Sequence, residues 1–311
     1  MKNLILTLII TLPLTLWGQE WTKTFGGLGE EYGSSVQQTT DGGFIITGRT
    51  NSFGFSNDVY LIKTYENGVE QWSKTFGESE NDNGNFVQQT TDGGFIIIGN
   101  TNSFSINNGS EIWLIKTDEN GEEQWNQTFG GVEQDYGKSV QQTIDGGFII
   151  IGQTESFGNG GRDVYLIKTD ENGIEQWSKI FNENEVGTMD YGTSVQQTND
   201  GGYIVTGFSY STFSVVSFEI ILFKTDVNGN NQWNKSFDVI PYVGDYEHYD
   251  EGCSVQQTTD GGYIITGVVG TTGDGNEDEH GDLFLIKTDG QGNISSTFEI
   301  PLPNPNRKLE K

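Results

Sequence analysis

The chain has 311 residues, with 44 acidic and 16 basic side chains and a formal net charge of −28. A surface of this sign repels phosphate backbones and anionic lipids, so nucleic acid is excluded as an expected partner. The sequence has no alanine and 44 glycines, and Thr, Ile, Val, Phe and Tyr are abundant, so helix is disfavoured and an all-β fold is expected.

Residues 1–18 have the pattern of a secretory signal peptide. Lys2 precedes an apolar run from Leu4 to Leu16, and the small residue Gly18 follows it. Pro13 interrupts the run, which is too short to span a bilayer comfortably. We therefore expect a mature protein that is secreted or on the outer cell surface and is not inserted in the membrane. A retained anchor is the alternative.

Residues 19–298 form five copies of one unit, each running from one tryptophan to the next. The five tryptophans are Trp21, Trp72, Trp125, Trp177 and Trp233. A period near 50 residues is typical of β-propellers and not of helical solenoids. The sequence therefore predicts one repeat domain with five blades.

Each copy contains four predicted strands. In the third copy they are residues 139–143, 148–152, 164–169 and 175–181. Asp-Gly-Gly joins the first strand to the second in every copy. Asn-Gly joins the third to the fourth in four copies, and Gln291-Gly292 replaces it in the last. These glycines allow the positive φ of a tight hairpin, so turn chemistry accounts for the recurring Asp and Asn without a metal.

The second and third strands are almost uninterrupted apolar runs, as expected for sheets that are covered on both faces. Four-stranded antiparallel blades stacked around an axis provide that cover, and paired glutamines on the first strand can bridge neighbouring blades. Residues 21–25 and 294–300 both resemble the fourth strand that the fifth blade still needs. Because the N-terminal segment keeps Trp21 where the C-terminal one has Ser296, we expect a five-bladed β-propeller whose ring is closed by the N-terminal strand.

Cys253 is the only cysteine, so the exported domain contains no internal disulfide and depends on its core. Other residue types occupy the same position in the other copies, namely Ser34, Asn85, Lys138 and Thr193. This variation indicates that the position tolerates different side chains and argues against Cys253 as a nucleophile. The nucleophile remains the alternative, because His248 lies five residues away and could act as its base.

The connections between the second and third strands, and between one copy and the next, emerge on one rim and vary in length and composition. Variable loops on a regular frame commonly carry binding residues. The longest loops belong to the fourth and fifth copies. The candidate ligand-binding residues there are Tyr242, Asp245, Tyr246, His248, Tyr249 and Asp250. Aromatic faces between carboxylates suit sugar rings or a partner's side chains; alternatively, these aromatic residues only fix a long loop.

The acidic run at residues 273–282 is the candidate metal site. Oxygen-bearing side chains alternate along it, at Asp274, Asn276, Asp278 and Asp282. Calcium is the cation that such ligands suit, and no other cofactor is expected. The run differs from an EF-hand loop, because it has Glu279 where that loop needs glycine and Leu285 where it needs a closing Glu. A solvated acidic loop is the alternative.

An acid also precedes the third strand of every copy, and we interpret it as ordering the loop. These acids are Asp58, Glu111, Asp163, Glu219 and Asp282. A lysine recurs within the same strand, and we interpret it as a packed stem that forms an ion pair. These lysines are Lys63, Lys116, Lys168, Lys224 and Lys287.

The segment IKTDENGEEQW, residues 115–125, resembles the tryptophan-docking motif of quinoprotein-like propellers, in which Asp, a Gly turn and Trp recur once per blade. The whole unit resembles the repeats of secreted proteins of Bacteroidetes and some archaea. Quinone-dependent dehydrogenases would imply a cofactor pocket, often with paired cysteines, and this chain has one cysteine. Residues 299–311, EIPLPNPNRKLEK, resemble the start of a type IX secretion sorting signal, which implies a truncated sorting domain. An ordinary disordered tail is the alternative.

The sequence favours a secreted, monomeric, non-catalytic recognition or adhesion propeller that binds an extracellular glycan or protein. Some five-bladed propellers are lectins, which is an analogy of fold. A glycan-processing enzyme of the five-bladed glycosidase type is one alternative. Its chemistry needs two carboxylates in unlike surroundings, whereas regular repeats supply equal ones. A purely structural surface protein is the other alternative.

Overall fold

The computed structural model describes residues 20–54, 56–105, 109–158, 161–181, 188–211, 217–239, 248–271 and 280–294. These residues form strands, turns and extended chain, with no helix, and so none that could cross a membrane. The expected signal peptide and the C-terminal tail lie outside this part of the chain, as does Ser296.

The strands form five antiparallel sheets in chain order, and a single parallel pairing of Ser217 with His248 joins the fourth sheet to the fifth. The first contains β1 (Glu31–Gln38), β2 (Phe44–Thr50), β3 (Asp58–Thr64) and β4 (Glu70–Phe76). The second contains β5 (Asp82–Gln89), β6 (Phe95–Thr101), β7 (Glu111–Thr117) and β8 (Glu123–Phe129). The third contains β9 (Asp135–Gln142), β10 (Phe148–Thr154), β11 (Asp163–Thr169) and β12 (Glu175–Phe181). The fourth contains β13 (Thr188–Gln197), β14 (Tyr203–Ser211), β15 (Ser217–Thr225) and β16 (Asn231–Phe237). The fifth contains β17 (His248–Gln257), β18 (Tyr263–Thr271) and β19 (His280–Thr288).

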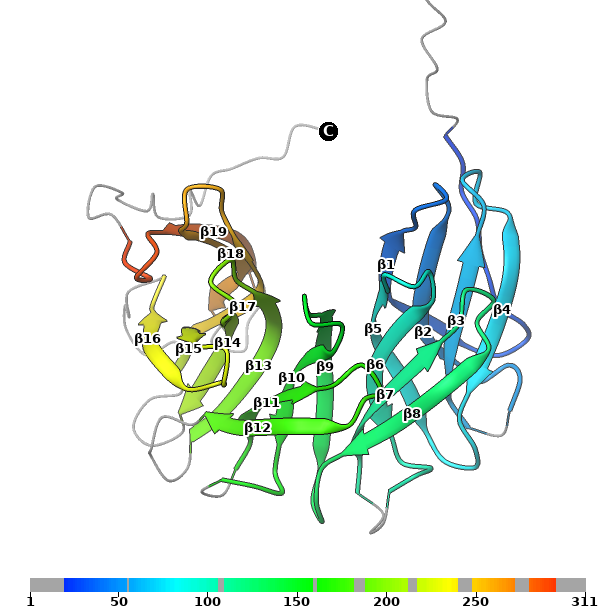
Figure 1. The fold of residues 1–311 in the computed structure, drawn as a ribbon, viewed down its shortest axis with the longest axis horizontal. Helices are drawn as coiled ribbons and strands as arrows, with labels where there is room; N and C mark the ends of the chain where they lie inside the picture. Colours follow the sequence, from blue (N-terminus) through cyan, green and yellow to red (C-terminus); the bar gives the residue numbers. More distant parts are fainter. Residues whose placement is uncertain are drawn as a thin grey trace, which may run out of the picture.

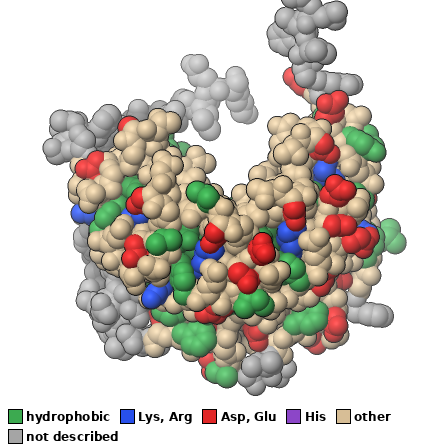
Figure 2. Space-filling model, in the orientation of Figure 1, with side chains coloured by type: hydrophobic (Ala, Val, Ile, Leu, Met, Phe, Trp, Pro, Cys, Tyr) green, Lys and Arg blue, Asp and Glu red, His purple; other side chains and the backbone are tan. Residues whose placement is uncertain are grey.

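The five sheets are arranged as blades around a central space (Figure 1). The first strand of each blade lies innermost, and the fourth strand of each of the first four blades lies outermost. The first and fifth blades are the two ends of an arc, and the space-filling view shows a notch between them (Figure 2). The prediction of an all-β repeat protein is confirmed, and the sheets of four, four, four, four and three strands are consistent with a propeller of about five blades. In the arc the first and fifth blades do not meet, so the structure does not show the predicted closure.

Each first strand begins earlier than the sequence predicted. In the third blade the strand starts at Asp135 and not at Ser139, because Gly137 continues the pairing instead of ending it. The register shifts by one residue after this glycine, which leaves Lys138 as a β-bulge. The same shift occurs in all five blades. Cys253 occupies the bulge of the fifth blade, which explains why this position accepts different residue types.

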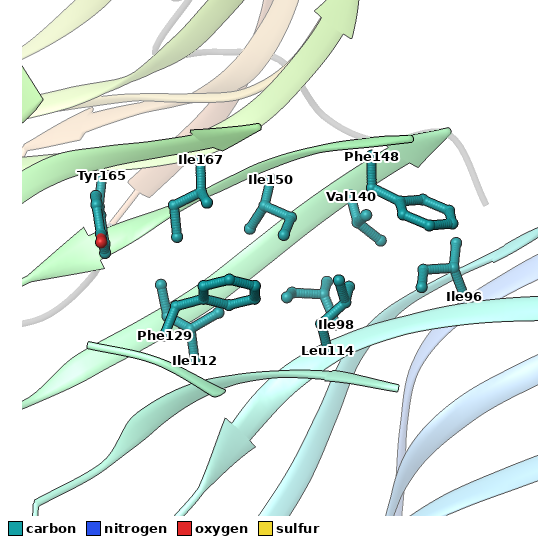
Figure 3. Close-up of a cluster of buried hydrophobic side chains, with 10 residues drawn as sticks. All are labelled: Ile96, Ile98, Ile112, Leu114, Phe129, Val140, Phe148, Ile150, Tyr165 and Ile167. Carbon is teal, nitrogen blue, oxygen red and sulfur yellow. The ribbon is translucent and has the colours of Figure 1, made fainter. Parts of the chain in front are cut away.

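The core lies between blades. In Figure 3, Ile98, Ile112 and Leu114 of the second blade point toward Val140 and Ile150 of the third. All five side chains are at most 1% exposed. Equivalent clusters join the first blade to the second, the third to the fourth and the fourth to the fifth. Because each blade supplies half of an interface, neighbouring blades stabilise one another.

Tryptophan docking also joins neighbouring blades. Trp72 of the first blade packs edge-on against Phe95 of the second, with ring centroids 5.8 Å apart. A Cβ at Gly121 would lie 2.6 Å from the Trp72 ring, so the Asn-Gly turn leaves room for the indole. The same aromatic contact recurs at 5.8 Å between the following blades, in Trp125–Phe148, Trp177–Tyr203 and Trp233–Tyr263. Tryptophan therefore has a structural role in each repeat.

The side chains of the first-strand glutamines bridge blades by accepting hydrogen bonds from backbone amides. Gln37 Oε1 accepts from the Gln89 backbone amide of the next blade at 2.6 Å, and Gln89 Oε1 in turn accepts from the Thr40 backbone amide at 2.9 Å. The first of these bonds recurs at three further junctions, at 2.6 to 2.7 Å. The predicted bridging role of the glutamines is confirmed.

Candidate functional site

The rim that carries the Asp-Gly-Gly turns is uniform. In the first blade, the Asp41 carboxylate accepts hydrogen bonds from Thr39 Oγ1 at 2.5 Å and from the Gly43 amide at 3.1 Å. Lys63 Nζ lies 2.8 Å from the same carboxylate and donates to the Thr64 carbonyl at 2.9 Å. The Lys63 hydrogen bond, followed by the one from Thr39, lowers the pKa of Asp41 well below its usual range.

This ion pair is present in every blade. The other pairs are Lys116–Asp92, Lys168–Asp145, Lys224–Asp200 and Lys287–Asp260. The lysine side chain is at most 5% exposed in the first four blades, whereas Lys287 in the fifth is 47% exposed. The recurring lysines and turn aspartates are thus structural, as the sequence predicted, and this rim offers five near-copies of one turn.

The opposite rim carries the variable connections between strands, and the predicted ligand-binding residues are described only in part. Tyr242, Asp245 and Tyr246 lie outside the described residues. His248 begins β17, and the Tyr249 ring lies over Gly270, its partner on β18.

Asp250 is fully buried, and its Oδ2 accepts the Val239 amide at 2.7 Å. Of the residues predicted to bind a ligand, Asp250 therefore anchors the chain that leads into the long loop.

The predicted calcium run is described only at its end. Asp274, Asn276 and Asp278 lie outside the described residues, and Asp282 lies on β19 with an exposed side chain. The calcium hypothesis for this run thus stays a prediction.

A pair of acids sits at the junction between the first and second blades. Asp58, at the start of β3, is 8% exposed, and Asp82, at the start of β5, is completely buried. A Cβ at Gly77 would meet both Asp58 Oδ1 and Asp82 Oδ2, the latter at 2.7 Å, so the two carboxylates face each other across this glycine. Burial, and then the charge of Asp82, raise the pKa of Asp58.

The two acids differ in their partners. Asp82 Oδ2 accepts hydrogen bonds from Ser103 Oγ at 2.6 Å and from the Glu78 amide at 3.2 Å, so Asp82 orders the loop between the blades. Asp58 Oδ1 is buried and has no hydrogen-bond partner among the described residues.

The same juxtaposition recurs at the next two junctions. The Asp82 amide donates to the Asn57 carbonyl at 2.7 Å, which places Asp82 beside Asp58. In the same way, the Asp135 amide donates to the residue before Glu111 and the Asp190 amide to the residue before Asp163, both at 2.6 Å. An acid at the start of a first strand therefore lies beside the acid that starts the third strand of the preceding blade.

Sequence reasoning identified the acid before each third strand and also Asp250, but it missed the other acids near the beginning of the first strands. An acid stands two residues before a glycine there in every copy. The missed acids are Glu31, Asp82, Asp135 and Asp190, and Asp250 occupies the same place in the fifth copy. This constant spacing was the available signal, but it was read as part of a variable loop.

Cys253 does not have the surroundings of a nucleophile. Desolvation by its neighbours, and then the charge of Glu251, raise the pKa of its thiol. Its Sγ lies 3.7 Å from the Glu251 carbonyl. A raised pKa disfavours the thiolate, which is the reactive form.

A cavity of ≈ 370 Å³ opens beside β19, where it is lined by Asp260, Lys287 and Ile294 among others. In the second blade the corresponding lysine, Lys116, donates from Nζ to Gln124 Oε1 of the fourth strand at 3.1 Å. The cavity thus marks the place of an outer strand that β17–β19 lack.

No family model and no curated protein matches the sequence. Solved structures with a similar arrangement include an endo-arabinase from Bacteroides thetaiotaomicron, with TM-score 0.44 and 10% identity over 84% of this chain and 96% of that one. A putative exo-beta-1,3-galactanase from Bifidobacterium bifidum has TM-score 0.41 and 13% identity, covering 85% and 91%. The Pan2 WD40 domain from Neurospora crassa has TM-score 0.43 and 11% identity, covering 78% and 75%. These likenesses carry no functional information for this chain.

Proposed function

We propose that this chain is a secreted, monomeric, non-catalytic recognition or adhesion propeller that binds an extracellular glycan or protein through its variable rim. The observation that supports this function is the contrast between the rims. One rim repeats the same ion-paired turn in five blades, and the other carries connections that differ from blade to blade. A repeated frame with one diversified edge suits recognition.

The proposed domain is a closed ring. The first and fifth blades support closure, because each exposes one half of the interface that joins the other blades. On the fifth blade Leu285 is 69% exposed, whereas its equivalents in the first four blades are 0% exposed. On the first blade Val36 is 64% exposed, whereas Val87, its equivalent in the second, is 1% exposed. Docking the fifth blade on the first would repeat the interface seen at the other junctions.

The N-terminal segment supports the same closure. Trp21 lies 5.8 Å from Phe44, edge-on, and a Cβ at Gly68 would meet its ring. Trp72 makes the same two contacts with the second blade, as the tryptophan of the first blade's outer strand. Trp21 therefore already holds the position that belongs to the outer strand of a preceding blade, which in a ring is the fifth.

A glycosidase is the second candidate function, but the carboxylate pairs give it little support. Asp58 and Asp82 are buried, so a substrate could not reach them. A glycosidase acts through two accessible carboxylates in unlike environments, whereas these pairs recur from junction to junction.

The proposal is tested by screening the mature chain, residues 19–311, against a glycan array and a panel of extracellular proteins. The informative variant is the double substitution Tyr242→Ala and Tyr246→Ala in the variable rim. Tyr65→Ala is the matched control, because Tyr65 is a 54% exposed tyrosine on the uniform rim. Binding that is lost only in the double variant supports the proposal. Release of reducing sugar would favour the enzyme, and no binding or turnover would favour a structural role.

A further inference from the structure

The inference begins with Asp58. The residue is 8% exposed, and its buried Oδ1 has no hydrogen-bond partner among the described residues. The carboxylate faces Asp82, a second acid that is completely buried. Two like charges withdrawn from water together repel each other and lose their hydration. Such a pair needs a positive partner or a proton between its members.

Loop ordering explains only part of this arrangement. Asp82 uses Oδ2 to hold Ser103 and the Glu78 amide, and Asp135 uses Oδ2 to hold Ser156 Oγ at 2.7 Å and the Gly131 amide at 2.9 Å. Asp135 Oδ1 is nevertheless buried without a hydrogen-bond partner in the described residues. Asp82 and Asp135 thus each use Oδ2 to order a loop, and loop ordering gives no role to Asp58 Oδ1 or Asp135 Oδ1.

Lysine does not fill that role at the first junction. The lysine on the same strand as Asp58 is Lys63, and its Nζ is bound to Asp41 at the other end of the strand. The whole chain has 16 basic side chains against 44 acidic ones. A soluble cation is therefore the natural counter-charge, and the strongly acidic protein would concentrate it.

The backbone at Gly77 approaches both acids closely. Gly77 follows the end of β4 with φ 151°, a conformation that favours glycine. Any Cβ there would meet both Asp58 Oδ1 and Asp82 Oδ2. Gly130 has φ 152° at the equivalent place in the next junction, where a Cβ would meet Asp135.

We propose that the paired acids at the first two blade junctions, Asp58 with Asp82 and Glu111 with Asp135, bind calcium, so that at each of them one ion links the third strand of one blade to the first strand of the next. The described residues contain no group of three His, Cys, Asp or Glu that could hold a metal. The remaining ligands are therefore backbone carbonyls, Ser or Asn oxygens and water. Carboxylates with neutral oxygens match calcium, which accepts irregular sites of six to eight ligands more readily than magnesium does.

This inference is independent of what the variable rim binds. It assigns the calcium to the blade junctions and not to the 273–282 run. In a protein with a single cysteine, such ions would fasten the first three blades to one another in place of disulfides.

The test measures calcium binding to the mature chain, residues 19–311, after removal of metal with EGTA. Equilibrium dialysis against ⁴⁵Ca²⁺ is expected to show sites with Kd values on the order of 10⁻⁴ to 10⁻³ M, the range of extracellular modules. Adding 10 mM Ca²⁺ is expected to raise Tm by about 5 °C or more, because the ion binds only the folded chain. Mg²⁺ at the same concentration is expected to raise Tm less.

Asp58→Asn is the informative variant, because it removes one charge of a pair and keeps the shape. It is expected to bind one calcium fewer and to melt in EGTA at the same temperature as the wild type or higher, since the repulsion is relieved. Glu66→Gln is the control for diffuse binding to the acidic surface and is expected to retain every site.

Three results would overturn the inference. The first is the absence of calcium binding at 10 mM, which would mean that a proton satisfies the pair. The second is an equal response to Mg²⁺, which would contradict the assignment to calcium. The third is an Asp58→Asn variant that binds as much calcium as the wild type. If Asp58→Asn does not fold even in EGTA, Asp135→Asn is measured in its place by the same criteria.

Discussion

Truncating Leu285 tests whether the fifth blade is covered in solution. Leu285 is 69% exposed in the arc, and Leu166, its equivalent in the third blade, is 0% exposed. Truncating a buried leucine costs about 2–5 kcal/mol, whereas a largely exposed one loses little apolar contact and costs about 0.5 kcal/mol. In a closed ring Leu285 would be covered by the first blade. We therefore expect Leu285→Ala to lower the free energy of unfolding by about 2–3 kcal/mol, close to the effect of Leu166→Ala.

The assay is urea unfolding followed by tryptophan fluorescence, with all variants at one calcium concentration. The free energy of unfolding is extrapolated to water, and the slope m reports whether the exposed area has changed. Ile144→Ala, at an 89% exposed position, provides the baseline for a surface truncation. A Leu285→Ala effect equal to that baseline, beside a large Leu166→Ala effect, would refute closure.

Three further predictions concern the repeats. Trp125→Ala removes the ring that docks on Phe148 and is expected to cost about 3 kcal/mol in the same urea assay; an unchanged midpoint would show that docking is dispensable. Because the folded-state pKa of Asp41 is lowered, its ion pair stabilises the fold above the unfolded pKa of about 3.9, and this contribution disappears as the pH falls below it. Tm should therefore fall as the pH is lowered below about 4, and it should fall less steeply in Asp41→Asn than in the wild type. Parallel curves of Tm against pH for the two proteins would contradict the assignment of this ion pair. Cys253→Ser, at a bulge, should change the free energy of unfolding by less than about 0.5 kcal/mol and leave ligand binding intact. Loss of an activity in this variant would instead support a nucleophilic role for Cys253.

The fold was predictable from the sequence because its turns are explicit. Gly42 and Gly68 have φ values of 85° and 73°, as the Asp-Gly-Gly and Asn-Gly motifs predicted. The fourth strand of the third blade was predicted at its observed bounds, 175–181. The first strand was predicted too short, because a glycine usually interrupts a strand. Here Gly137 lies against Ile98 and Gly99 of the preceding blade, and close approach between blades requires the missing side chain.

The carboxylate pairs could not be predicted, since their members lie in different blades. Asp58 and Asp82 are 24 residues apart, with an outer strand and a loop between them. Only the stacking of blades brings their carboxylates together. The first and fifth blades show the reverse. Here the five-fold repetition predicted a contact between these two blades, and the structure does not contain it.

Hydrogen exchange of the mature chain, read by mass spectrometry, tests the central claim of a closed ring most directly. If residues 21–25 pair with β19 as the outer strand of the fifth blade, the backbone amides of both segments will be protected as well as those of β12 and β11. Exchange of both segments as fast as an unstructured peptide, with β12 and β11 protected, would contradict the ring.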